Sequence, residues 1–256
     1  MLRKLGKGLL ALLLLLLVAA ALFAAFNWTL VSNMVGIAGV KITEVEKFQP
    51  ALTVKGCTGA ALAKAPPALP ATAFAAMRAY SDEHQGVGLV VLKDGAIAGE
   101  AYRPGASAVT RSASQSMHKS VLALMIGIAA NDGVIASPDD PVGRYVSEWA
   151  NDPRGRITLR QLLAMESGLD YSSMAKMELP ALDLMMGQAT AAALDTPAER
   201  APGQYNYNNV DYQIAGLALS RALATAGRRD YASYLSEKLW CPLGNRSATL
   251  WQEFAG

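Results

Sequence analysis

The feature that most limits what this chain can be is a long uncharged segment at its start. No residue from Leu9 to Val31 is charged, whereas Arg3, Lys4 and Lys7 stand ahead of this segment. About 20 uncharged residues can cross a hydrocarbon core of about 30 Å, and positive charges before them favour a cytoplasmic N-terminus. We therefore predict a signal anchor over residues 1–31, in the inner membrane, with the following domain in the periplasm. The alternative is a cleaved signal and a secreted domain.

Outside this segment the composition is that of one mid-sized globular domain. The 256 residues carry 23 Lys+Arg and 21 Asp+Glu, and so balanced a charge argues against nucleic acid as a partner. The two cysteines and two histidines cannot make a four-ligand zinc site with recognisable spacing, so we expect neither a metal nor a cofactor. Cys57 and Cys241 either pair, as an oxidising compartment allows, or are unrelated residues.

Turn residues and apolar spacing divide the rest of the chain in two. Residues 32–70, of which 49–70 are rich in Pro, Ala and Gly, predict a linker or an irregular arm. Residues 71–256 predict one α+β domain with a β-hairpin at 88–92 and 96–102 around an Asp-Gly turn. Other segments predict helices, at 74–80, 121–131, 141–149, 159–165, 182–194, 210–223 and 231–240.

A polar tetrad, Ser116-Met117-His118-Lys119, stands directly before a nearly all-apolar helix. Positions i and i+3 of a helix are neighbours, so Ser116 and Lys119 fall on one face. A serine hydroxyl needs a base to become a good nucleophile, and a lysine beside it can help to move the proton. His118 falls off this face, and we expect it at the surface or behind the site. By itself the tetrad is better explained as a helix cap with a solvated lysine, because Ser-x-x-Lys occurs by chance in many proteins.

A second polar stretch, Tyr205-Asn206-Tyr207-Asn208-Asn209, follows a turn and opens the helix predicted from residue 210. Catalytic groups tend to lie on loops that a rigid scaffold holds. A tyrosine that faces a lysine ammonium can act as a general base. Alternatively, the stretch is a polar turn in which an Asn caps the helix, and neither stretch decides its function alone.

Together the two stretches resemble the penicillin-binding-protein and β-lactamase superfamily. Ser116-x-x-Lys119 and Tyr207-x-Asn209 carry the resemblance, and the Tyr-x-Asn form is similar to the class C branch and its esterase and amidase relatives. With the tetrad, the pattern Leu-Leu-x-Met-x-Ser-Gly at 162–168 looks most like 6-aminohexanoate-dimer hydrolases. The resemblance covers about residues 70 to 256.

The resemblance implies a role for each of these residues. Ser116 is the expected acylated nucleophile, and its backbone N–H the expected half of an oxyanion hole. Lys119 and Tyr207 form the implied proton-transfer pair, and Asn209 orients them or binds substrate. Glu166 we interpret as structural rather than as a deacylating carboxylate. The implied activity is hydrolysis of a small-molecule amide or ester by a serine hydrolase; the alternative is a non-catalytic relative that binds a ligand or peptide, or an inactive fragment.

The superfamily's third motif, Lys, His or Gly followed by any residue and Gly on a late strand, has no match after Asn209. A hairpin that stands alone is at best marginally stable. We therefore expect a chain truncated at its C-terminus, poorly soluble and largely inactive by itself. We also expect the helical part of the domain to pack on an antiparallel sheet, of which this chain contains only the N-terminal hairpin. The sequence leaves the oligomeric state open.

Overall fold

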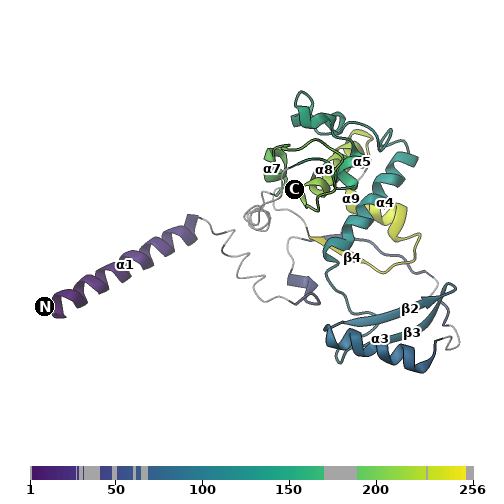
Figure 1. Cartoon of the computed structure of the whole chain (residues 1–256), viewed down its shortest axis with the longest axis horizontal. Helices are drawn as coiled ribbons and strands as arrows, with labels where there is room; N and C mark the ends of the chain where they lie inside the picture. Colours follow the sequence, from purple (N-terminus) through teal and green to yellow (C-terminus); the bar gives the residue numbers. More distant parts are fainter. Residues whose placement is uncertain are drawn as a thin grey trace.

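The computed structural model describes residues 2–26, 28, 31, 41–47, 51–59, 62–64, 69–169, 189–228 and 230–251. The first helix, α1 (Leu2–Phe26), extends away from the rest of the chain in Figure 1. None of the helices within the described ranges is long and apolar enough to span a membrane. The structure therefore does not support the membrane helix that we predicted in residues 1–31.

The predicted β-hairpin is present. Strand β2 (Gly88–Lys93) pairs antiparallel with β3 (Ala96–Tyr102). Asp94 and Gly95 form the connecting turn with φ angles of 52° and 77°. A two-residue turn of this kind needs positive φ at both positions, because only then does its twist match that of the two strands.

One helix accompanies the hairpin. Helix α3 (Ala71–Glu83) lies along it in Figure 1, and the Phe74 ring occupies the space that a Cβ at Gly99 would need. No residue of α3, β2 or β3 is fully buried. The hairpin and α3, which we call the hairpin region, thus contact each other without forming a closed core among the described residues.

A second two-stranded sheet corrects two predictions. Strand β1 (Ala51–Val54) pairs antiparallel with β4 (Ala248–Trp251), although we predicted an irregular arm at 32–70 and no sheet besides the hairpin. Strand β1 forms by pairing with a segment almost 200 residues later in the sequence. No local pattern around residues 51–54 reveals this partner. Just beyond the two strands' paired ends, Cys57 and Cys241 are joined by a disulfide, with Cα atoms 4.8 Å apart.

Most of the remaining described chain is helical, and we call residues 114–251 the helical region. Its α-helices are α4 (His118–Asn131), α5 (Leu159–Leu163), α7 (Ala189–Asp195), α8 (Val210–Thr225) and α9 (Tyr231–Leu235). Of the helix predicted over 182–194, residues 182–188 lie outside the described residues. The helix predicted over 231–240 passes after α9 into a π-helical turn, Ser236–Trp240.

The prediction of an α-helix over residues 141–149 is wrong. This segment forms two 3₁₀ turns, Val142–Arg144 and Ser147–Trp149. The Val142 N–H donates to the carbonyl of Ile157 at 2.7 Å, so the backbone bonds to a neighbouring segment as well as to itself. Backbone also approaches closely at Gly143, where a Cβ would meet Gly155 at 3.0 Å. Packing between segments here overrides the helical spacing of the apolar residues.

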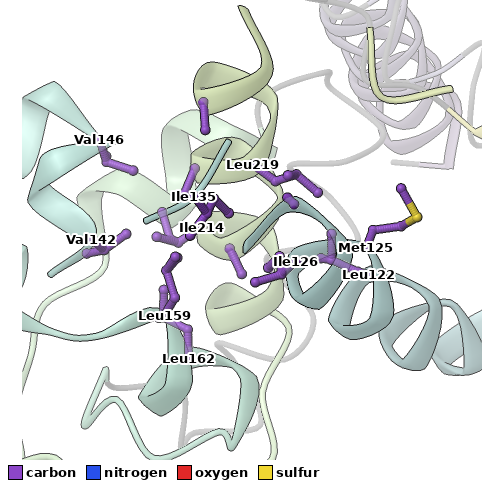
Figure 2. Packing of buried hydrophobic residues seen from close by; sticks show 14 of the residues in the cluster. Leu122, Met125, Ile126, Ile135, Val142, Val146, Leu159, Leu162, Ile214 and Leu219 are labelled. Carbon is purple, nitrogen blue, oxygen red and sulfur yellow. The ribbon is translucent and has the colours of Figure 1, made fainter. Parts of the chain in front are cut away.

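Helices α4, α5 and α8 supply much of the core (Figure 2). The labelled residues from these helices all belong to the buried cluster, and they are Leu122, Met125, Ile126, Leu159, Leu162, Ile214 and Leu219. The core continues into the segment of the two 3₁₀ turns through Val142, Trp149 and, between the turns, Val146. No described residue of the hairpin region belongs to this buried cluster.

Candidate active site

The predicted nucleophile, Ser116, lies in a 3₁₀ turn, Gln115–Met117, that leads directly into α4. The pairing of Ser116 with Lys119 assumed α-helical spacing, and the structure places Ser116 in a tighter turn just before the α-helix. Gln115 has a φ of 49°, a left-handed conformation that non-glycine residues adopt seldom and that gathers at active sites. Ser116 thereby stands near the N-terminal end of α4, where the helix dipole favours negative charge.

Lys119 connects the nucleophile to the second polar stretch. Its Nζ donates to Ser116 Oγ at 3.1 Å and to Asn209 Oδ1 at 2.8 Å. Asn209 is the residue immediately before α8, and α8 packs against α4. The packing of two core helices therefore sets the distance between the two predicted motifs.

Tyr207 faces the same serine from the loop before α8. Its O–H donates to Ser116 Oγ at 2.6 Å, and Lys119 Nζ lies 5.3 Å from the centre of its ring. The hydrogen bond to Ser116 and the positive charge of Lys119 hold the pKa of the Tyr207 phenol below its usual value, although desolvation acts the other way. The structure thus brings together all four predicted site residues, with a phenol and an amine on one serine hydroxyl.

A further aromatic residue, Tyr212, borders the site and was missed in the sequence. Lys119 Nζ lies 5.8 Å from the centre of the Tyr212 ring, and the Tyr212 O–H donates to the carbonyl of Leu163 at 2.9 Å. Tyr212 stands inside the apolar spacing of α8, where an aromatic side chain is expected simply to pack in the core. Only the packing of α4 on α8 shows that it faces the lysine.

Two neighbouring residues take no direct part in this cluster. The His118 ring is half-buried and its Nε2 lies 3.4 Å from the Tyr231 hydroxyl; burial and the nearby Lys119 charge lower the pKa of this histidine. Glu166 contacts the Tyr207 loop through its backbone, since its carbonyl accepts from the Gly203 N–H at 2.9 Å.

The site is open to solvent. Ser116 and Asn209 are exposed, and Tyr207 keeps 50% of its surface accessible. Beside the nucleophile turn lies a cavity of about 680 Å³ whose lining includes Gln115 and Tyr212. Within the described ranges, His, Cys, Asp and Glu side chains do not gather in groups of three or more that hold a metal ion.

Comparison with known proteins defines the class to which this arrangement belongs. The sequence model of the β-lactamase family matches residues 72–256, and the chain therefore belongs to the β-lactamase family. A curated relative, "Beta-lactamase-like protein 2" of Dictyostelium discoideum, is 26% identical over 149 residues. The matched part is 54% of this chain and 26% of that protein.

Two solved structures share the fold. A protein from Bacillus anthracis described as a 6-aminohexanoate-dimer hydrolase superposes with a TM-score of 0.69 at 18% identity, over 84% of this chain and 61% of that one. A protein from Bacteroides dorei DSM 17855 described as a β-lactamase superposes with a TM-score of 0.54 at 24% identity, over 67% of this chain and 50% of that one. This chain thus spans only part of the length of each of these relatives.

Proposed function

We propose that this domain is a serine hydrolase that cleaves a small-molecule amide or ester through an acyl-enzyme on Ser116. One observation carries the proposal: the Tyr207 oxygen at 2.6 Å and the Lys119 nitrogen at 3.1 Å both contact Ser116 Oγ. A nucleophile and a base within hydrogen-bond reach, with the base oriented by a third group, form the arrangement required for nucleophilic catalysis. Membership of the β-lactamase family supports the same chemistry.

In the proposed acylation, Tyr207 acts as the general base in its phenolate form. Ser116 Oγ attacks the substrate carbonyl carbon while its proton passes to the Tyr207 oxygen, and the carbonyl π electrons move onto the oxygen. The Ser116 backbone N–H, near the positive end of the α4 dipole, supports this oxyanion. When the intermediate collapses, the bond to the leaving amine or alcohol breaks, and that group takes the proton from Tyr207.

Deacylation reverses the roles with water as the nucleophile. The water gives a proton to Tyr207 and attacks the acyl carbon, after which Ser116 Oγ leaves and regains the proton. Lys119 stabilises the phenolate through its positive charge, and Asn209 holds the Lys119 amine by accepting its hydrogen bond at 2.8 Å. No other group is needed to balance the protons in either half-reaction.

A fluorophosphonate that labels activated serines tests the proposal. We expect Ser116→Ala to abolish labelling and Tyr207→Phe to slow it by about 10²- to 10⁴-fold, because general-base catalysis contributes that much. Tyr205→Phe is the matched control: Tyr205 is 68% exposed and belongs to the same loop, and we expect its labelling to be unchanged. Labelling that persists in Ser116→Ala contradicts the proposal. Absence of labelling in every form, with the fold intact, favours the ligand-binding alternative.

The pH dependence of labelling checks the identity of the base. Because only the phenolate accepts a proton, the labelling rate should rise with pH until Tyr207 is ionised. The lowered pKa of Tyr207 predicts that this rise levels off below the usual tyrosine range near pH 10. Tyr207→Phe should lose that part of the profile; a profile that survives the substitution contradicts Tyr207 as the base.

We also infer that the domain acts in an oxidising compartment, such as the periplasm that the leader predicts. The disulfide between Cys57 and Cys241 supports this location, because disulfides seldom persist in the cytosol. The measurement is maleimide labelling of the native protein in intact cells and after reduction. We expect both thiols to react only after reduction. Reaction of both thiols with maleimide before any reduction would contradict the location.

A further inference from the structure

We propose that Ser167 and Asp211 are positioning residues that hold Tyr207 and its loop against Ser116. The inference rests on the proposed function, because it assigns these two residues a purpose in acylation. It also gives a role to the Leu-Leu-x-Met-x-Ser-Gly segment, of which neither the proposed nucleophile nor the proposed base is a part.

Ser167 and Asp211 form a buried polar pair between two segments far apart in the chain. The two residues are 1% and 0% exposed. Ser167 Oγ donates to Asp211 Oδ1 at 2.5 Å and accepts from the Leu169 N–H at 3.0 Å. Asp211 lies in the first turn of α8, so this bond fixes the start of that helix to the turn after α5.

The same turn contacts the Tyr207 loop through its backbone. The Asn206 N–H donates to the carbonyl of Met165 at 2.8 Å, beside the bond from Gly203 to Glu166 described above. Met165 and Gly168 have φ angles of 56° and 78°, and a Cβ at Gly168 would meet the Arg200 carbonyl. The turn is therefore shaped to place two carbonyls and the Ser167 hydroxyl under the loop.

A buried side chain completes the link to Tyr207. Asn208 is 2% exposed; its Oδ1 accepts from the Asp211 N–H, and its Nδ2 donates to the carbonyl of Asn206, both at 2.8 Å. Tyr207 itself is half-exposed, and its hydroxyl donates a hydrogen bond to the nucleophile. Its place at Ser116 therefore depends on the fixed residues on either side of it.

The burial of polar groups around this pair lowers the stability of the fold. Asp211 Oδ2 and Asn206 Nδ2 are buried and find no hydrogen-bond partner among the described residues, and such groups cost stability. Apolar residues of similar shape would hold two segments together at least as well. Directional bonds add what apolar contacts do not, namely a fixed orientation for the loop.

The test is a double-mutant cycle between Ser167→Ala and Tyr207→Phe, read as the fluorophosphonate labelling rate of Ser116. If Ser167 acts through Tyr207, Ser167→Ala slows labelling by about 10- to 100-fold in the natural background, as a misplacement of about 1 Å does. In the Tyr207→Phe background it then has less than about a 2-fold effect, because the group that it positions is gone.

Tyr145→Phe is the matched control. It also removes a short, partly buried hydrogen bond, 2.5 Å from the Tyr145 hydroxyl to Asp140, and with it the bond that this hydroxyl accepts from the Ala136 N–H, and neither bond involves the Tyr207 loop. We expect it to leave the labelling rate unchanged in both backgrounds. Asp211→Asn keeps the shape and an acceptor oxygen for Ser167, and it should label within about 3-fold of the natural protein. Asn208→Ala should reproduce the effect of Ser167→Ala and replaces it if that variant does not fold.

Three results overturn the inference. In the first, Ser167→Ala slows labelling of Ser116 equally in the natural and the Tyr207→Phe backgrounds. In the second, it slows labelling in neither background. In the third, Asp211→Asn slows labelling as much as Ser167→Ala does. The proposed function fails in a separate way, by labelling that persists in Ser116→Ala or is unchanged in Tyr207→Phe. The two failures are thus read from different variants.

Discussion

The helical region and the hairpin region are built in opposite ways. The helical region buries side chains completely, among them Ile126, Leu159 and Leu219 at 0% exposure. In the hairpin region no residue of the named elements is buried, and Val90 and Leu92 keep 50% and 56% of their surface accessible. All four predicted site residues belong to the helical region. The precision of the site therefore comes from the packing of α4 on α8, and the described hairpin contributes little to it.

The contrast has a simple origin in the two sequences. Leu122, Met125, Ile126 and Ala129 repeat at the spacing of one helical face, so α4 turns a continuous apolar stripe toward α8. In the hairpin, exposed and half-buried positions alternate along the first part of β2, and every residue of β3 is half-buried. Neither strand, nor α3 beside them, turns a fully buried apolar face toward the others.

The largest effect should come from truncating matched leucines in the two regions. Leu219→Ala removes a side chain that is 0% exposed, and we expect it to lower the free energy of unfolding by about 2–5 kcal/mol. Leu92→Ala, at 56% exposure, should change it by less than about 0.5 kcal/mol. Urea unfolding followed by circular dichroism measures both. Equal losses would show that the hairpin region shares the core and would break the comparison.

A smaller effect should come from the buried carboxyl of the helical region. Desolvation raises the pKa of Asp211 to about 6 from its usual 3.8, so between about pH 4 and 6 the folded state keeps a proton that the unfolded chain has lost. The contribution of Asp211 to the free energy of unfolding therefore falls as pH rises through that window, by at most about 3 kcal/mol. Asp211→Asn removes this dependence, so its stability relative to the natural protein should increase from pH 4 to pH 7.

Two further carboxylates, one exposed and one half-buried, act in the opposite direction and cancel in that comparison. Arg221 and Arg154 hold the pKa values of Glu148 and Asp152 at about 2, so their contribution is present above about pH 4.5 and is lost as pH falls toward 2. Both proteins retain these pairs. A difference between the two proteins that stays constant with pH would contradict the titration of Asp211.

The smallest effect should come from helix caps. In the helical region Thr158 caps α5: its Oγ1 accepts from the Gln161 N–H at 3.1 Å, and the Gln161 side chain accepts from the Thr158 N–H at 2.9 Å. In the hairpin region α3 starts after Pro70 without a side-chain cap. Thr158→Ala should cost about 1 kcal/mol, and the exposed Thr72→Ala in α3 less than about 0.5 kcal/mol. Thermal unfolding of the two variants compares them; equal shifts would show that the cap adds nothing.

Local signals predicted most of what local interactions determine. The Asp-Gly turn predicts the hairpin, and turn residues with apolar spacing predict α4, α5 and α8, all within a few residues of their ends. The motif spacing also selected the four residues that the structure brings together around Ser116. Their catalytic roles remain predictions until the variants are measured.

Contacts between distant segments account for what the sequence did not reveal. Strand β1 has its partner at β4, the two 3₁₀ turns replace a helix because Val142 bonds to Ile157, and Asp211 meets Ser167 only in the folded chain. A polar residue such as Asp211 in the first turn of a helix is ordinarily explained by the helix dipole. Nothing nearby in the sequence indicates that its carboxyl is buried.

The disulfide has a mechanical consequence. Cys57 and Cys241 lie 184 positions apart in the sequence, and the disulfide closes the chain between them into a covalent loop. This loop contains Ser116, Lys119, Tyr207 and Asn209. Beside the bridge, β1 and β4 pair in antiparallel register. Tension applied to the chain on either side of the loop therefore passes through the sulfur–sulfur bond and not through α4 or α8. The site is shielded from any pull on the segment that precedes the domain, and a single cut inside the loop leaves the two pieces joined.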